Sequence, residues 1–237
     1  MKWNGFAKKF FILLPFWIAG ILLILISVQL SELYTAQSKA NEYAKSLLNR
    51  ANEIYYNVNK SLDYLNENTS DKCGEALKIA TYDYRFIEDA GRIKGNEIIC
   101  SAMKMAFYGY KLSNDKLILD ESIKIWEKID GYMNSNFKVK VIAKKQSFIV
   151  LSPHAYNAYQ IPPKHTTGSI MSLDGKITYY EFSNHSSNKF YLVTESRACS
   201  ENKYFCANSR VYSNILLNYG SGRLFFYIII GIFLVVF

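Results

Sequence analysis

An uncharged apolar run near the N-terminus constrains this chain more than any other feature of its sequence. Residues 10–30 read FFILLPFWIAGILLILISVQL and contain no Asp, Glu, Lys or Arg. A helix needs about 20 predominantly apolar residues to cross the hydrocarbon core of a bilayer, so this run is long enough. We therefore expect a transmembrane helix at residues 10–30 and the lipid bilayer as its partner.

The alternative for this run is a cleaved signal peptide, whose apolar region is usually about 7–15 residues long. Small residues near Ala36 and Ala40 leave cleavage open, but the length of the run favours an anchor. Three lysines, at positions 2, 8 and 9, precede the run and no acidic residue does. Because basic residues stay on the cytoplasmic side, residues 1–9 are expected to be a cytoplasmic tail.

The C-terminal residues 224–237 form a second uncharged run, LFFYIIIGIFLVVF. At 14 residues the run is too short to span a bilayer, and a terminal carboxylate within the membrane would be costly. We expect the start of a truncated second transmembrane helix, with a tail buried in the domain core as the alternative. Residues 31–223 then form one domain outside the cytoplasm.

Helical spacing is clearest directly after the first apolar run. Leu47, Ala51, Ile54, Val58 and Leu65 recur at intervals that place them on one face of a helix, which we expect over Tyr34–Leu65. The same stripe fits a two-helix seam with another copy of the chain, so a homodimer through this helix stays open beside packing within the domain.

Shorter helices are expected at residues 72–81, carrying Cys73 and capped by Ser70 or Asp71, and at residues 114–133. The second of these follows from the spacing of five apolar residues: Leu119, Ile123, Trp126, Ile129 and Met133.

Strand patterns alternate with turns in the rest of the domain. Two hairpins are expected, residues 89–93 with 97–100 around Gly95, and residues 169–173 with 176–180 around a two-residue Asp174-Gly175 turn. Further strands are expected at residues 137–141 and 147–151, and a last one at 189–194. The predicted fold class is α+β: a long membrane-proximal helix and short helices packed on an antiparallel sheet, flanked by transmembrane helices.

Four cysteines, Cys73, Cys100, Cys199 and Cys206, all lie between the two apolar ends. On the expected topology they face an oxidising compartment, where paired cysteines form disulfides. Four cysteines allow three pairings, and the spacing favours Cys73–Cys100 and Cys199–Cys206. Whether these bridges are structural staples or include a reducible, regulatory one stays open.

Signatures of catalysis and of metal or nucleic-acid binding are missing from the sequence. No cysteine pair has CxxC spacing, no Gly-rich phosphate loop occurs, and the histidines at positions 154, 165 and 185 have no partner at helical spacing. The net charge of +8 divides into +3 for residues 1–9 and +5 for the rest of the chain, where both signs are mixed rather than clustered as on a nucleic-acid surface. We expect no catalytic residue, no metal, no cofactor and no nucleic acid for this chain.

The segment from Cys73 to Met103 resembles the core of the CSS-motif domain, the periplasmic sensory module of bacterial EAL-type cyclic-di-GMP phosphodiesterases. The likeness rests on Arg85-Phe86-Ile87, on the turn at Gly95, and on Ile98-Ile99-Cys100-Ser101-Ala102. Cys100 and Ser101 match the motif, whereas Ala102 stands where the family has a second serine.

The resemblance implies a periplasmic domain on the bacterial inner membrane, with Cys100 in a redox-sensitive disulfide served by periplasmic thiol–disulfide oxidoreductases. It implies regulation of an EAL domain, expected after the second helix, that hydrolyses cyclic-di-GMP to pGpG. A ligand-binding sensory domain of a chemoreceptor-like or kinase-type receptor is the first alternative, and an envelope structural protein is the second.

Overall fold

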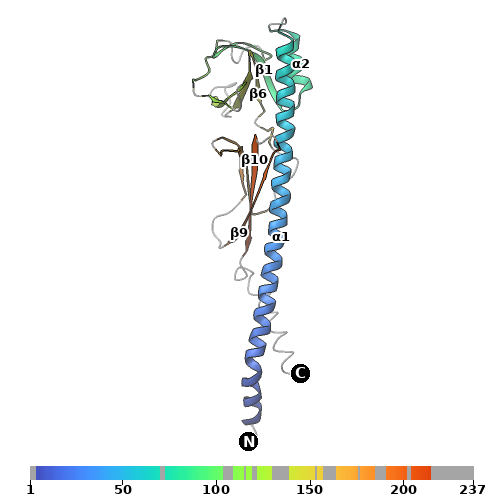
Figure 1. The fold of residues 1–237 in the computed structure, drawn as a ribbon, viewed down its shortest axis with the longest axis vertical. Helices are drawn as coiled ribbons and strands as arrows, with labels where there is room; N and C mark the ends of the chain where they lie inside the picture. The colour runs from blue at the N-terminus through green and yellow to red at the C-terminus, as the bar shows by residue number, and fades with distance from the viewer. Residues whose placement is uncertain are drawn as a thin grey trace.

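A computed structural model gives an α+β architecture in which two antiparallel sheets lie one after the other along a single long helix (Figure 1). It describes residues 4–69, 73–103, 109–114, 116–118, 122–129, 139–152, 154–156, 164–175, 177–184, 191–201 and 204–214. The elements are α1 (Asn4–Glu67), α2 (Glu75–Asp83), β1 (Ile87–Lys94), β2 (Glu97–Ser101), β3 (Leu117–Ile118), β4 (Ile123–Ile129), β5 (Val139–Lys144), β6 (Ser147–Leu151), β7 (Thr166–Ser172), β8 (Thr178–Ser183), β9 (Tyr191–Cys199) and β10 (Phe205–Asn214).

The six-stranded distal sheet has the order β2-β1-β6-β5-β4-β3, and the four-stranded proximal sheet has the order β8-β7-β10-β9. The proximal sheet lies nearer to the N-terminal end of α1 (Figure 1). We expected one sheet, and the chain builds two.

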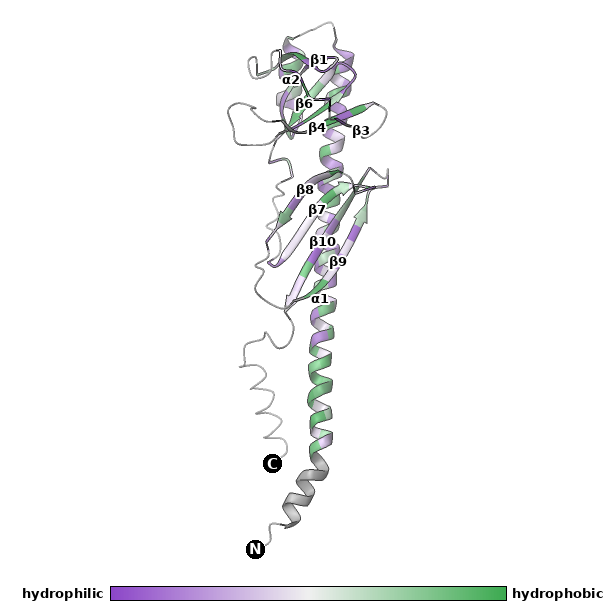
Figure 2. Cartoon of the chain, turned by 90° about the vertical axis from the view of Figure 1, so that its left-hand side faces the viewer, coloured by the Kyte–Doolittle hydropathy of each residue, from purple (hydrophilic) through white to green (hydrophobic). Residues whose placement is uncertain are grey.

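The N-terminal part of α1 is an apolar rod that no other described segment covers. Its best apolar window has a mean hydropathy of 2.1 and none of it is buried, so this one helix is long and apolar enough to cross a membrane. Figure 2 colours this part of the helix as hydrophobic.

The expected tail at residues 4–9 is already helical. The expected second span, residues 224–237, lies outside the described residues.

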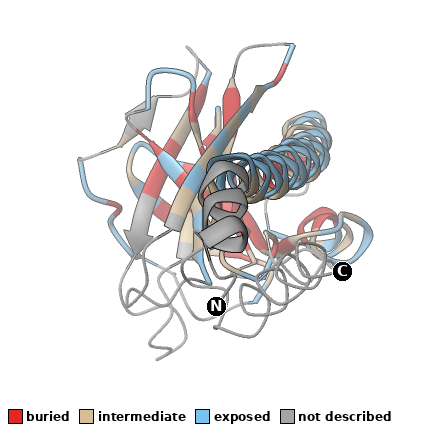
Figure 3. Ribbon diagram, turned by 90° about the horizontal axis from the view of Figure 1, so that it is seen from below, coloured by how far each residue is buried: buried red, intermediate tan, exposed pale blue. Residues whose placement is uncertain are grey.

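The helix expected over Tyr34–Leu65 is confirmed as the continuation of this rod. Its apolar stripe is buried against the chain's own sheets: Leu47 and Ala51 belong to the core under the proximal sheet, and Ile54, Val58 and Leu65 to the core under the distal sheet. Viewed along its axis, the rest of α1 is largely exposed (Figure 3). A homodimer contact would therefore have to use a more polar face of the helix than the stripe.

The β1–β2 hairpin is confirmed, with Lys94 opposite Glu97 and Gly95 at a φ of +63° in the turn. Gly91 in β1 is required for a different reason, the close approach of its neighbours. A Cβ at this position would lie 2.2 Å from the carbonyl oxygen of Cys100 and 2.4 Å from the ring of Phe148. The absence of a side chain lets β2 and the ring approach the same point of the strand.

The helix expected over residues 114–133 is wrong, because the described part of this segment forms β3 and β4. Ile123 and Ile125 point into the core under the proximal sheet, while Trp126 packs into a core of the distal sheet. Apolar residues that face two different cores produced the spacing that resembles a helix. β-branched residues such as these isoleucines favour strands.

The strands expected at residues 137–141 and 147–151 correspond to β5 and β6, which pair with each other, and the expected hairpin of β7 and β8 is confirmed. The β7–β8 turn is longer than two residues, because Ser172 and Ile177 close it with a backbone hydrogen bond of 2.8 Å. The last expected strand extends to Cys199, and β10, which the sequence analysis did not predict, pairs with both β7 and β9. Its stretch from Ala207 to Arg210 is small and polar, so composition did not indicate a strand.

Candidate functional site

The disulfide between Cys73 and Cys100 joins the entry of α2 to the edge strand β2 of the distal sheet. The two Cα atoms are 6.0 Å apart and the residues are separated by 27 positions. Cys73 lies before α2, not within the helix as expected, because α2 begins at Glu75 after Gly74. Cys73 is exposed, whereas Cys100 is partly buried and packs against the core under the distal sheet.

The disulfide between Cys199 and Cys206 has a different setting, because these residues are direct cross-strand partners in β9 and β10. Their Cα atoms are 4.0 Å apart. The turn that follows is closed separately, since the Ser200 amide donates to the Phe205 carbonyl at 2.9 Å. Both pairings are those that the spacing favoured, and this second bridge staples a hairpin that already has its own hydrogen bonds.

The motif residues that follow Cys100 lie against β1. Ser101 is buried and stands opposite Gly91 in the ladder. The Ala102 amide donates to the Ala90 carbonyl at 2.7 Å, and the Ala102 methyl packs on the core under the distal sheet. A serine at position 102, as in the family motif, would bring a hydroxyl to this apolar contact.

Asp89 of β1 is the site residue that the sequence analysis missed. It is fully buried, and its Oδ1 accepts hydrogen bonds from the amides of Ala90 at 2.8 Å and Met103 at 3.2 Å. This carboxyl therefore fixes the turn that follows the cysteine–serine motif. Within the described part of the chain, Asp89 Oδ2 and the Ser101 hydroxyl make no hydrogen bond of good geometry.

Burial raises the pKa of the Asp89 carboxyl above 3.8, against the opposing effect of the nearby amides and of the Ser101 hydroxyl, which favour the ionised form. A protonated Asp89 has an O–H that it can donate, and the Ser101 hydroxyl is one of the groups that act on this carboxyl. The turn after the cysteine–serine motif thus rests on a buried acid whose charged form is disfavoured by burial.

Arg92, three residues along β1, links this site to the end of α1. It is buried, and its guanidinium donates to the carbonyls of Leu65 at 2.7 Å and Asn68 at 2.8 Å. It also donates to the Ser147 hydroxyl of β6. The last turn of α1 contains no basic residue of its own, so Arg92 supplies the positive charge that complements the helix C-terminus.

A sequence signal for these two residues existed. Asp89 and Arg92 are charged, yet they lie in a strand whose neighbours Ile87, Ala90 and Ile93 are apolar. Charged residues are rarely fully buried unless they have partners, so their presence in a core strand indicates a polar network.

The described residues contain neither a metal-binding group nor a free thiol. No group of three His, Cys, Asp or Glu side chains there could hold a metal ion, and no cysteine there is free. His185 lies outside the described residues. The described cysteines are all paired, and the chemistry that they can perform is thiol–disulfide exchange.

Comparison with protein-family models matches residues 36–186, well over half of the chain, to the CSS motif domain associated with EAL. The match includes Cys73, Cys100, Asp89 and Arg92, and it ends before the second disulfide. Searches of curated proteins and of solved structures found no match.

Proposed function

This chain belongs to the family of CSS motif domains associated with EAL, and on that premise we propose that it is a membrane-anchored periplasmic redox sensor that regulates a cyclic-di-GMP phosphodiesterase. The anchor is the uncovered apolar part of α1, and the inner membrane is its location. The sensing element is the Cys73–Cys100 disulfide. The regulated activity is hydrolysis of cyclic-di-GMP to pGpG by an EAL domain on the cytoplasmic side.

The observation that carries the proposal is the different placement of the two disulfides. Cys199–Cys206 joins neighbours within one hairpin, so its loss frees no distant element. Cys73–Cys100 joins an exposed turn to an edge strand across 27 residues. Opening this bridge would release the entry of α2 from β2 while both elements keep their other packing contacts.

A physical route leads from the bridge to the membrane. Cys100 lies on β2, which pairs with β1, and β1 holds the C-terminal end of α1 through Arg92. Helix α1 then continues without interruption to its apolar N-terminal part. A change in the position of β1 would therefore act on the helix that enters the bilayer. Coupling of this kind requires two states that the bridge favours unequally.

The redox step balances as an exchange with a dithiol of the periplasmic oxidoreductase class. One thiolate of the donor attacks a sulfur of Cys73–Cys100, and a mixed disulfide forms. The second donor thiolate then releases the protein, which gains two electrons and two protons while the donor becomes a disulfide. The exposure of Cys73 makes this bridge accessible to such a donor.

Selective reduction tests the sensing step. The 237-residue chain in detergent would be equilibrated with increasing dithiothreitol, alkylated, and mapped by mass spectrometry. We expect alkylation of Cys73 and Cys100 at reductant concentrations that leave Cys199 and Cys206 oxidised and the circular dichroism unchanged. The β9–β10 ladder keeps the second thiol pair adjacent, so that this bridge re-forms readily. If both bridges open only when the chain unfolds, the proposed redox sensor is excluded.

A further inference from the structure

The proximal sheet packs one face on α1 and leaves the other face open (Figure 2). Along β7 the residues alternate between buried ones on the α1 side, such as Ile170, and partly exposed ones on the open side, such as Ser169. We call the open side the outer face. It is hollowed, with a volume of about 640 Å³, and its lining includes two acidic and two basic side chains: Glu181, Glu195, Arg197 and Arg210.

Four side chains of the outer face form one row across the sheet. The strand register places Ser169 of β7 between Glu181 of β8 and Asn208 of β10. Arg197 of β9 stands beside Asn208 at the other end of the row. Since β8 and β9 are the two edges of the sheet and strands lie about 4.8 Å apart, about 14 Å separates the acid from the base.

The two end charges of this row have no ionic partner among the described residues. Glu181 and Arg197 are both exposed, and the Arg197 guanidinium donates only to the neutral carbonyl of Leu173, at 3.2 Å, within the described part of the chain. In the next row of the same face, Arg210 and Glu195 pair with each other at 2.8 Å. The row thus ends in two complementary charges that cannot reach each other within one copy.

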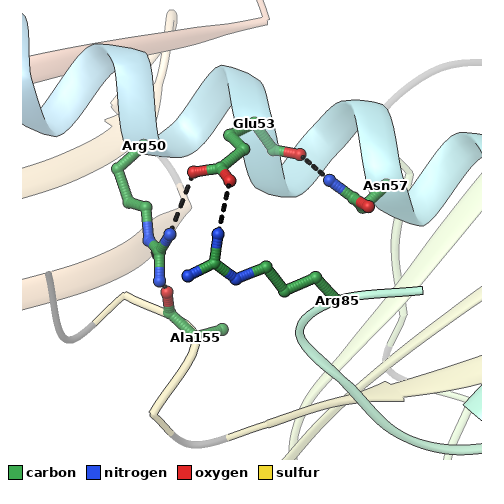
Figure 4. A network of polar contacts seen from close by, with 5 residues as sticks. All are labelled: Arg50, Glu53, Asn57, Arg85 and Ala155. Carbon is green, nitrogen blue, oxygen red and sulfur yellow. Dashed lines mark hydrogen bonds and ion pairs between the residues drawn. The ribbon is translucent and has the colours of Figure 1, made fainter. Parts of the chain in front are cut away.

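Several other charged side chains lie beside an opposite charge. Arg50 and Arg85 each approach a carboxylate oxygen of Glu53, at 2.9 Å and 3.3 Å (Figure 4). Lys144 lies 2.8 Å from Asp63. The end charges of the row therefore differ from the ion pairs that the fold makes elsewhere.

A second copy in the same membrane can meet the outer face in one way only if the pair is symmetric. Two copies anchored by α1 point in the same direction, so a two-fold axis between them runs along the helix, in the lengthwise direction of β9 and β10 (Figure 1). Across such an axis the strand order of one sheet is reversed over the other. Strand β8 then faces β9 of the partner, and Glu181 faces the partner's Arg197.

The spacing of packed sheets suits this contact. Two sheets that pack face to face lie about 10 Å apart, a gap that a glutamate and an arginine side chain bridge together. The side chains between them in the row, Ser169 and Asn208, are short and leave room for the approach. The two-fold axis repeats each contact, so the pair of Glu181 with Arg197 forms twice.

From the complementary end charges and the direction of the anchor, we propose that the outer face of the proximal sheet is a docking surface for a second copy of this chain. Two ion pairs between Glu181 and Arg197 fix the register of the dimer, and confinement to one membrane raises the effective concentration of the two copies. The proposal rests on the proposed membrane anchor but not on redox sensing. The contact is separate from one through α1.

Photo-cross-linking of the 237-residue chain in membranes tests the contact. The cross-linking residue p-benzoylphenylalanine would replace Asn208, in the hollow of the outer face, or Asn52, on the exposed side of α1, as the matched control. We expect cross-linked dimer from position 208 and at least about fivefold less from position 52. An equal or greater yield from position 52 would assign the contact to the helix and overturn the proposal, as would the absence of dimer. Carbonate extraction of the membranes tests the anchor separately.

Charge reversal tests the ion pairs themselves. Glu181→Arg and Arg197→Glu should each lower the yield of dimer from position 208 about fivefold or more, because like charges then face each other. The double variant restores opposite charges and should recover the yield. Lys45→Glu, on the exposed side of α1, is the matched control and should leave the yield unchanged. An undiminished yield in a folded single variant would overturn the proposal, as would a double variant that docks as poorly as the single ones.

Discussion

At the scale of single residues, burial disfavours the charged form of the Asp89 carboxyl and raises its pKa above the ordinary value. Its Oδ1 accepts two amide hydrogen bonds, and burial outweighs them and raises the pKa. In the unfolded chain the carboxyl loses its proton at lower pH. Between the unfolded and folded pKa values the folded state therefore holds the extra proton, and stability falls as pH rises through that window.

Asp89→Asn should remove this pH dependence. The asparagine keeps the Oδ1 acceptor, and its amide can donate to the Ser101 hydroxyl. We expect the free energy of unfolding of the wild type to decline relative to Asp89→Asn as pH rises from about 3.8, the ordinary value for this carboxyl. Chemical denaturation at a series of pH values measures the difference. Parallel profiles for the two proteins would mean that Asp89 does not take up a proton on folding.

Asp89→Ala provides the contrasting case, because it removes both hydrogen bonds to the turn after the motif. Relative to Asp89→Asn it should cost about 1–3 kcal/mol at every pH, which is the usual penalty for leaving buried amides unsatisfied. Equal stability of the alanine and asparagine variants would show that the Ala90 and Met103 amides find other partners.

The sequence could predict the site residues whose pairing follows from their spacing along the chain. Cys73, Cys100, Cys199 and Cys206 were paired from their positions and an oxidising environment alone. Asp89 stands out in the sequence as a charge within an apolar strand, but its role was not predicted, because the Met103 amide reaches it only in the folded chain. Arg50 and Arg85 come from distant elements and meet only in three dimensions (Figure 4).

At the scale of elements, α1 and the distal sheet are joined at the helix C-terminus. Arg92 donates to the carbonyls of Leu65 and Asn68, and Ser147 donates to the Asn66 side chain at 2.9 Å. These contacts make the end of the helix and β1 one mechanical unit. Any displacement of β1 should therefore reach α1.

Arg92→Met tests this junction. The methionine preserves much of the buried volume but leaves the carbonyls of Leu65 and Asn68 and the Ser147 hydroxyl without the guanidinium donor. We expect a loss of about 2–4 kcal/mol in the free energy of unfolding and faster amide hydrogen exchange at the end of α1. The matched control is Arg210→Met, whose partner Glu195 is exposed, and it should cost less than about 1 kcal/mol. If Arg92→Met and Arg210→Met destabilise the chain equally, the contact between Arg92 and the end of α1 is not part of the proposed route from the disulfide to the membrane.

Helix α1 was predicted correctly because its apolar residues lie on one buried face. The stripe from Leu47 to Leu65 faces the sheets from one side of the helix, so its period is clear. Strand β4 sends Ile123 and Trp126 into different cores, and their spacing resembled that of a helix. Strand β10 is small and polar in its middle, and its pairing with β7 and β9 makes it a strand.

At the scale of the whole molecule, the helix that carries the sheets is the same helix that can enter a membrane. Its 64 residues correspond to a length of about 96 Å. The apolar part is uncovered and the remainder is packed against both sheets. The arrangement places the distal sheet, with Cys73–Cys100, farthest from the apolar end (Figures 1 and 2).

Topology provides a prediction at this scale. Alkaline phosphatase, which is active only outside the cytoplasm, should be active when fused after Asn218 and inactive when fused after Lys9. The reason is the basic tail before an uncharged run of 21 residues. The reverse pattern would place all four cysteines in a reducing compartment and exclude the proposed sensor.

The central claim is that the Cys73–Cys100 bridge restrains the output and the Cys199–Cys206 bridge does not. The most direct measurement is cyclic-di-GMP hydrolysis in membranes by the full-length protein carrying Cys100→Ser, Cys73→Ser or Cys199→Ser, with circular dichroism as the folding control. We predict that the first two variants stay folded and raise hydrolysis about fivefold or more, the lower range of allosteric coupling. Cys199→Ser should change hydrolysis less than about twofold and lower stability by about 2 kcal/mol. Equal behaviour of all three variants, whether unfolded or silent, would contradict the account.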